Sequence, residues 1–162
     1  MGDRMSYTVR FASTPAERDA AYALRRAVFE VEQNVPRPLD RDSNDENADH
    51  VVVLAEDGAC VGTGRAVRLD TRTCQIGRMA VLAAWRRRGV GEAVLTSLER
   101  IAALRGLAEI VVHAQLPAES FYLKRGYARA GEPFEDQGLT HVVVRRKLPR
   151  PVIAAPDVAA GA

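Results

Sequence analysis

The chain has 162 residues, of which 47% are hydrophobic and 27% are charged, and its formal net charge is +2. This length and mixture are typical of one globular domain with a core of its own. The small net charge gives no reason to expect a nucleic-acid-binding protein. The longest apolar run, from Met79 to Trp85, is too short to span a membrane. We therefore expect neither nucleic acid nor a membrane as a partner.

The N-terminal half predicts a strand, a helix and three more strands. Thr14-Pro15-Ala16-Glu17 is a capping box with proline at the first helical position. The helix it starts carries apolar residues at helical spacing as far as Val31. Residues 34–49 are polar and acidic, and form either a solvated loop or an acidic lip that attracts a cationic amine. Strands are predicted over 7–11, 50–56, 59–69 and 73–82, with Gly62 and Gly64 permitting a bulge or a close approach.

The C-terminal half predicts two helices and two strands. The helices are expected over 91–105 and 117–125, each ended by a glycine, and the strands over 109–114 and 139–148. This order of elements predicts an α/β fold with a mixed sheet. We expect residues 1–148 to form a single domain, and the alanine- and proline-rich residues 149–162 to be disordered.

The two cysteines indicate the redox environment. Cys60 should begin one strand of a hairpin and Cys74 should begin the next, beside the turn. About nine residues at about 3.3 Å each separate Cys60 from that turn, roughly 30 Å. A disulfide needs Cα atoms within about 7 Å. We therefore predict two free thiols and a cytoplasmic protein.

A strand from Ile76 to Leu82 leads into an arginine run and a glycine turn at the start of a helix. The run is Arg86-Arg87-Arg88 and the turn is Gly89-Val90-Gly91. Glycines let the backbone approach a ligand closely, and the first amides of a helix have no intrahelical partner. The helix dipole and the guanidinium groups add positive charge. The arrangement predicts a phosphate site.

Two common nucleotide motifs do not fit this turn. No G-x-x-x-x-G-K-[ST] run is present, and Val94 stands where a dinucleotide fingerprint needs its third glycine. What remains, Arg86-x-x-Gly89-x-Gly91, resembles the pyrophosphate loop [QR]-x-x-G-x-[GA] of the GNAT superfamily, the acyl-CoA-dependent N-acyltransferases. A second segment, Gln115-x-x-Ala118-x-x-Phe121-Tyr122-x-x-x-Gly126-Tyr127, looks like that family's N-x-x-A-x-x-[LF]-Y-x-x-x-G-F. With both motifs in order, the chain is identified as a member of the superfamily over about residues 6–148.

A third stretch resembles one branch of that superfamily. Leu24-Arg25-x-x-Val28-Phe29-x-Val31-Glu32-Gln33 looks like the ElaA-like branch, as do Asp40, Asp45, His50 and the late Phe134-x-x-x-Gly138-Leu139-x-His141. The branch does not indicate a natural substrate.

The resemblance implies a fold and a co-substrate. The fold is a mixed, mostly antiparallel central sheet flanked by helices, in which the parallel strands 73–82 and 109–114 splay apart. The co-substrate is acetyl-CoA, whose contacts would be Met79, Ala80, Val81, Arg86, Arg87, Arg88, Gly89, Val90, Gly91 and Gln115. We assign the phosphates to Arg86 and Arg88, whereas Arg87 could instead face solvent. No cluster of Cys, His and carboxylates has the spacing of metal ligands, so we expect no metal.

Acyl transfer from a thioester to an amine needs a base, an oxyanion donor and an acid, because a lysine-like amine has a pKa near 10.4. Tyr122 is the expected acid, since a phenol is protonated at pH 7, and the resemblance points to the same residue. By resemblance, the amide of Val81 is the oxyanion donor. For the base, Glu32, His50, His141 or a bound water remain open; we take Glu32 as catalytic and the two histidines as substrate-binding.

These features predict an acetyl-CoA-dependent N-acetyltransferase that acts by direct transfer in a ternary complex. The acceptor would be a small-molecule or protein amine, and the protein a monomer or homodimer. The alternative is a non-catalytic acyl-CoA sensor on the same fold. A nucleic-acid module using the arginine run is disfavoured, because the chain has only 6% aromatic residues.

Overall fold

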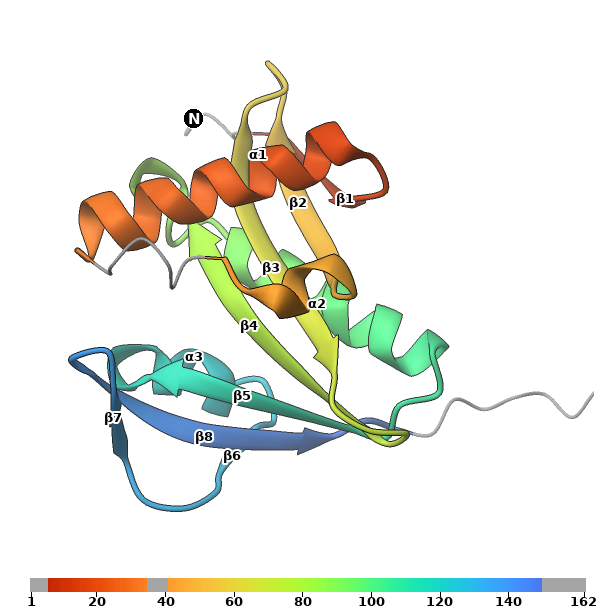
Figure 1. Cartoon of the computed structure of the whole chain (residues 1–162), viewed down its shortest axis with the longest axis vertical. Helices are drawn as coiled ribbons and strands as arrows, with labels where there is room; N and C mark the ends of the chain where they lie inside the picture. Colours follow the sequence, from red (N-terminus) through yellow and green to blue (C-terminus); the bar gives the residue numbers. More distant parts are fainter. Residues whose placement is uncertain (1–5, 35–40, 150–162) are drawn as a thin grey trace, which may run out of the picture.

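The computed structural model describes residues 6–34 and 41–149, which form an eight-stranded sheet with helices on both faces (Figure 1). The strand order is β1-β2-β3-β4-β5-β8-β6, and β7 pairs with β8. Neighbouring strands are antiparallel, except that β4 and β5 are parallel. The expected mixed, mostly antiparallel sheet is confirmed.

The elements follow the predicted order, with two short strands added. The strands are β1 (Tyr7–Phe11), β2 (Asp49–Ala55), β3 (Cys60–Arg68), β4 (Thr73–Val81), β5 (Glu109–Gln115), β6 (Ala128–Arg129), β7 (Phe134–Asp136) and β8 (Leu139–Lys147). The α-helices are α1 (Pro15–Arg26), α2 (Val90–Leu104) and α3 (Glu119–Leu123), and α1 continues as the π-helix η1 (Ala27–Glu32). The expected disordered tail, from residue 150 on, lies outside the described residues.

Helix α1 begins where the capping box predicts, but its α-helical winding ends at Arg26, before the predicted end near Val31. The backbone amide of Glu17 donates to the Thr14 hydroxyl at 3.1 Å, and Pro15 is the first helical residue. In η1 the winding changes, and the amide of Gln33 donates to the carbonyl of Val28 at 3.1 Å. The wider turn moves later residues off the apolar stripe. The expectation that Val31 faces the core is therefore wrong, and its exposed fraction is 76%.

Helix α2 packs on one face of the sheet and α1 on the other, as Figure 1 shows. An apolar stripe of α2 is buried at Val94, Leu95, Leu98 and Ala102. The close approach expected at two glycines of β3 is also present. A Cβ on Gly62 would lie 2.5 Å from Val90 Cγ1, and one on Gly64 would lie 2.7 Å from Val94 Cγ1, both on α2. Glycine at these positions lets α2 lie close against the sheet.

On the α1 side, the described part of the acidic segment, residues 41–49, folds inward around Asp45; Asp40 lies outside the described residues. Its side chain is 1% exposed and accepts hydrogen bonds at 2.8 Å from both Arg25 and Arg65. Arg65 also binds Asp42, at 2.7 and 2.9 Å. Burial alone would raise the pKa of Asp45, but the hydrogen bonds from Arg25, the Asp42 backbone and Arg65 outweigh it and hold the pKa well below its usual value. At Asp42 and Asp45, the segment is neither a solvated loop nor an acidic lip.

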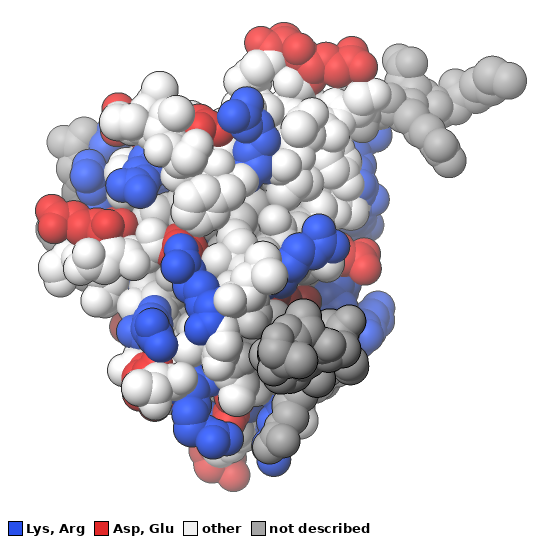
Figure 2. Space-filling model, turned by 90° about the vertical axis from the view of Figure 1, so that its right-hand side faces the viewer, with Lys and Arg blue, Asp and Glu red and all other residues white. Residues whose placement is uncertain are grey.

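The state of the cysteines, the surface charge and the length of the helices can each be compared with what the sequence predicts. Cys60 and Cys74 are both free, as predicted, and burial raises the pKa of each thiol to about 11. In the face shown in Figure 2, basic side chains lie in separate groups among acidic and uncharged ones. Within residues 6–34 and 41–149, no helix is both long and apolar enough to cross a bilayer.

The parallel strands β4 and β5 splay apart as expected. Their pairing runs from Thr73↔Glu109 to Ile76↔Val112 and stops there. Beyond Ile76, β4 stays paired with β3, and β5 stays paired with β8 as far as Gln115↔His141. The two halves of the sheet therefore diverge while each keeps its outer neighbour (Figure 1).

We expect Asp45→Asn to lower the free energy of unfolding by about 3 kcal/mol, because removing one partner leaves buried guanidinium groups uncompensated. Urea unfolding at pH 7 measures this. Asp19→Asn, a change of the same type on the exposed side of α1, should stay within about 0.5 kcal/mol of the wild type.

The pH dependence of the difference in free energy of unfolding between Asp45→Asn and wild type gives a second test. Because the folded-state pKa of Asp45 is depressed, its contribution is complete above the unfolded value of 3.8 and is lost as pH falls below it. The difference in free energy of unfolding should be constant from pH 7 to 5 and should decrease below about pH 4. A difference that persists undiminished in acid would contradict the charged pairing.

Candidate active site

The splay of β4 and β5 opens a cleft of about 600 Å³. Its walls come from the diverging ends of both strands, from α3, from η1 and from the start of β8. Among the predicted site residues, it is lined by Met79, Ala80, Val81, Arg86, Arg87, Gly91, Gln115, Tyr122 and His141. The cleft therefore brings most of the predicted site together.

The basic turn presents helix amides at one end of this cleft. Arg87 and Gly89 both have left-handed backbone, with φ of 59° and 80°. The first bond of α2 runs from the amide of Ala93 to the carbonyl of Gly89 at 3.0 Å. The amides of Val90 and Gly91 come before that bond and have no acceptor in the helix. An anion at this end would meet free amides and the positive end of the helix dipole.

The three arginines of the turn are not equivalent. Arg86 donates Nε to the carbonyl of Val81 at 3.0 Å and holds Glu32 with both Nη atoms, at 2.5 and 2.7 Å. Arg87 lines the cleft, and no described residue pairs with it. Arg88 donates to the carbonyl of Ala84 at 3.1 Å and is not among the lining residues. Of these three, Arg86 and Arg87 are thus placed for a ligand in the cleft, and the expected phosphate contact of Arg88 lacks support.

Glu32 is the partner of Arg86 in this structure. The hydrogen bonds from Arg86 lower the pKa of the Glu32 carboxyl. A carboxylate stabilised in this way is a poor proton acceptor. The geometry therefore favours an orienting role for Glu32 over the role of general base that we expected from the sequence.

Tyr122 is a buried phenol at the cleft wall. Its ring makes edge-to-face contacts with the rings of Phe121 and Tyr127, at 5.0 and 5.6 Å between centroids. The residue is 5% exposed, and burial raises the pKa of its phenol to about 12. It therefore keeps its proton through neutral and moderately alkaline pH, as a proton donor must.

The two predicted histidines have different environments. His50 is 1% exposed, bonds the carbonyl of Asp45 at 2.9 Å, and does not line the cleft. Burial lowers its pKa. The structure thus places His50 in the ion cluster under α1, not in the cleft.

His141 lies in the cleft beside Gln115, its partner across β5 and β8. Its Nδ1 is 2.8 Å from the carbonyl oxygen of Leu139. Because a carbonyl can only accept, Nδ1 carries the proton, and Nε2 of the neutral ring keeps its lone pair. Stacking on Phe134, at 5.7 Å between centroids, fixes the plane of the ring. His141 is a better placed proton acceptor than Glu32 or His50.

Sequence reasoning missed several lining residues. The Gln33 amide donates to Gln115 at 3.5 Å and accepts from it at 3.0 Å, linking the end of η1 to β5. Gln33 is part of the stretch that resembles the ElaA-like branch, but that resemblance assigned it no function in the site. Arg78 of β4, His113 of β5 and Asp136 of β7 also line the cleft, and no local pattern distinguishes them.

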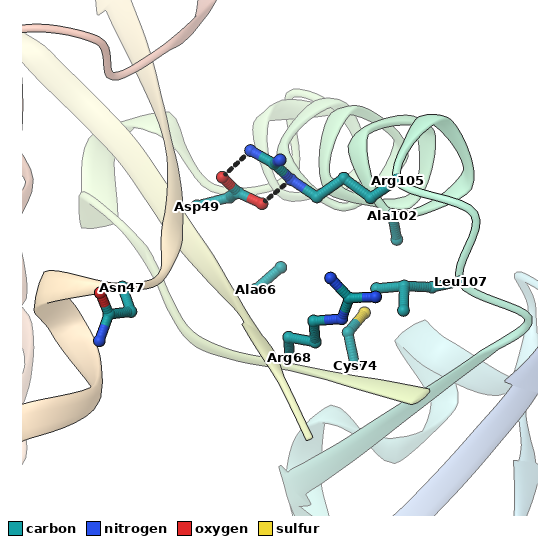
Figure 3. A pocket seen from close by; sticks show the side chains of 8 residues that line it. All are labelled: Asn47, Asp49, Ala66, Arg68, Cys74, Ala102, Arg105 and Leu107. Atoms are coloured by element: carbon teal, nitrogen blue, oxygen red, sulfur yellow. Dashed lines mark hydrogen bonds and ion pairs between the residues drawn. The ribbon is translucent and has the colours of Figure 1, made fainter. Parts of the chain in front are cut away.

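A second, smaller pocket of about 210 Å³ lies between the end of α2 and strands β2 to β4 (Figure 3). Arg105 and Asp49 meet across it through two hydrogen bonds of 2.6 Å each. Cys74 lies at its base with a thiol pKa raised to about 11. A neutral thiol and an ion pair satisfied within the protein offer little to a reaction, so the larger cleft is the candidate active site.

The comparisons with known proteins agree with this architecture. The family model of the Acetyltransferase (GNAT) domain matches residues 12–148, and the chain therefore belongs to the GNAT family of acetyltransferases. Two relatives from Bacillus subtilis (strain 168) are similar. The uncharacterized protein YyaT is 32% identical over 145 residues, 88% of this chain and 97% of YyaT. The uncharacterized N-acetyltransferase YjcF is 36% identical over 126 residues, 77% of this chain and 88% of YjcF.

A solved structure supports the resemblance to the ElaA-like branch. Escherichia coli ElaA matches with a TM-score of 0.74 at 27% identity, over 88% of this chain and 99% of ElaA.

Proposed function

We propose that this chain is an N-acetyltransferase that moves an acetyl group from acetyl-CoA directly to a primary amine, with both substrates in the large cleft. The observation that carries the proposal is the content of that one cleft. It joins a helix start with two arginines, an unpaired strand edge and a buried phenol. These are the groups needed to hold a diphosphate, an amide-containing arm and a leaving thiolate.

The residues present fit coenzyme A in three places. Arg86, Arg87 and the amides at Gly89, Val90 and Gly91 suit the diphosphate. The backbone of Met79, Ala80 and Val81 lies on the β4 edge that loses β5, so it can pair with the amides of the pantetheine arm as an added strand would. Gln115 can supply a further amide contact from the opposite wall. Arg88 is the predicted contact with least support, because it does not line the cleft.

Residues of the chain can then supply the base, the oxyanion donor and the acid that the transfer needs. His141 accepts a proton from the amine through Nε2, since Nδ1 is held by the carbonyl of Leu139. The amide of Val81 donates to the negative charge that develops on the thioester oxygen. Tyr122, with its pKa raised to about 12, donates its proton to the departing thiolate. The thioester supplies the activated acetyl group.

The first experiment is acetyl-CoA with an amine library, read by release of free thiol. Cys60 and Cys74 contribute little background, because burial raises the pKa of each to about 11. Amine-dependent release supports the enzyme. Binding of acetyl-CoA without release for any amine supports the alternative, a non-catalytic acyl-CoA sensor. The free thiols also agree with the cytoplasmic location that we propose.

Tyr122→Phe should lower turnover about 100-fold, the lower range for general acid catalysis, and leave CoA affinity within about twofold. Steady-state rates and calorimetry measure the two quantities. Tyr127→Phe is the matched control, because Tyr127 donates to Glu99 at 3.0 Å and does not line the cleft. It should lose stability and keep turnover. Equal rates for Tyr122→Phe and wild type would remove this residue from the mechanism.

Arg86→Ala should weaken CoA binding about tenfold, or about 1.4 kcal/mol, as expected for one charge-assisted contact. The loss should be greatest at low salt. Arg100→Ala, the same charge change at an exposed position of α2, should have almost no effect. Glu32→Gln should weaken CoA binding less than Arg86→Ala does, because it loses the carboxylate that orients the Arg86 fork and keeps the guanidinium itself. Wild-type affinity in Arg86→Ala would refute the diphosphate role.

His141→Gln should reduce turnover about 100-fold, and added imidazole should restore part of it. His113→Gln is the control on the same wall, since His113 also lines the cleft and meets Phe134 edge to face, at 5.6 Å between ring centroids. Its rate should stay within a few-fold of wild type. If His113→Gln were the impaired variant and His141→Gln were not, the assignment of the base would be wrong.

A further inference from the structure

Arg78 occupies an unusual place in the wall of the cleft. The pairing of β3 with β4 passes from Thr63↔Ala80 to Arg65↔Gly77. Strand β4 therefore has Arg78 and Met79 where β3 has Gly64 alone, which is a β-bulge. At this bulge Arg78 has φ of +50°, a backbone conformation that side-chain-bearing residues rarely adopt. Bulges re-aim side chains, and this one directs Arg78 to the cleft that it lines.

The Arg78 guanidinium is weakly satisfied by the described residues. Its partner among them is Asp42, at 3.2 Å from one Nη atom. Arg65 already holds both oxygens of that carboxylate, at 2.7 and 2.9 Å. The Arg78 Nε is buried and has no acceptor among the described residues. Burial and the charge of Arg65 lower the pKa of Arg78, which means that the site disfavours this cation and would gain from another anion.

The side chain is also accessible to a ligand, with 32% of its surface exposed. Arg86 and Arg87, where the diphosphate is expected, come after the C-terminal end of β4 at Val81, whereas Arg78 lies within the strand. Arg78 precedes Val81, the proposed oxyanion donor, by three residues of β4, about 10 Å at about 3.3 Å each. A carboxylate bound by the long Arg78 side chain can therefore belong to the same small molecule as an amine at the thioester.

We propose that Arg78 binds a carboxylate of the acceptor, so that the acceptor is a small amine that carries a carboxylate, as an amino acid does. The proposal rests on the proposed acetyl transfer to an amine. Arginine suits this role because its planar fork binds carboxylates through paired hydrogen bonds. Asp136, the carboxylate among the described lining residues, suits the ammonium form of the same molecule. The acceptor class is thus anionic at one end, in contrast to the simple cationic amine that an acidic lip would have favoured.

The test compares amines in matched pairs, each amino acid against its carboxamide and its decarboxylated amine. Thiol release gives kcat/KM for each member, and calorimetry in the presence of CoA gives binding without turnover. The carboxylate member should be preferred at least tenfold in both measurements. In Arg78→Gln that preference should fall to about twofold or less, mainly through KM. Arg68→Gln, at an exposed position of β3 outside the cleft, should keep the wild-type preference.

A second variant, Arg78→Gly, tests whether a loss of preference comes from the missing guanidinium or from a disturbed fold. Glycine adopts a positive φ without strain, so this variant deletes the guanidinium and relieves the backbone together. It should unfold at or near the wild-type temperature and still lose the preference. Retention of the preference in a folded Arg78→Gly protein would overturn the role of Arg78.

The outcomes separate this inference from the proposed function. Thiol release that is equal or faster with carboxamides or decarboxylated amines would refute the acceptor class and leave the acetyltransferase standing. No thiol release with any amine would refute the proposed function. Calorimetry in the presence of CoA then still tests the role of Arg78. If the protein binds carboxylate members and Arg78→Gly does not, the role is supported. If the protein binds no carboxylate member, the role is overturned.

Discussion

The site depends on one constraint in the sheet, the end of parallel pairing between β4 and β5 at Ile76↔Val112. Past this point each strand has a backbone edge without a ladder partner, and such groups must find water or a ligand. The opening does not unravel the sheet, because β3 holds β4 on one side and β8 holds β5 on the other. A stable fold therefore contains a built-in pair of unsatisfied edges that face each other across a cleft.

The end of helix α1 links the two diverging halves. Glu32 reaches Arg86, next to β4, and Gln33 reaches Gln115, on β5. Glu32 is the last residue of the π-helix η1 and Gln33 is its C-cap, so the π-helical winding changes their direction relative to an α-helical continuation. The same change that exposes Val31 thus directs a carboxylate and an amide to opposite walls of the cleft. A local irregularity in one helix sets two contacts of the site.

The sequence predicted the features that depend on local signals, and it missed those that depend on long-range pairing. The capping box at Thr14 and the glycine at 89 fixed the starts of α1 and α2 within a residue. The inward fold of Asp45 could not be foreseen, because its partners Arg25 and Arg65 lie 20 residues away on either side. Strands β6 and β7, of two and three residues, are too short for a period-two pattern. For the candidate site, the two motifs located the cleft, but the hydrogen bonds that separate His141 from Glu32 exist only in the folded chain.

The pair of Glu32 and Arg86 explains how a flexible arginine can be ready for an anion. A free guanidinium on a long side chain would lose rotamer entropy and part of its hydration on meeting a phosphate. Here the carbonyl of Val81 fixes Nε, and Glu32 fixes the fork in the orientation that an oxyanion needs. Replacing one anion with another at a fork already held in place costs less than ordering it afresh. The carboxylate that we first took for a base is therefore better understood as the group that keeps Arg86 in position until a more highly charged ligand displaces it.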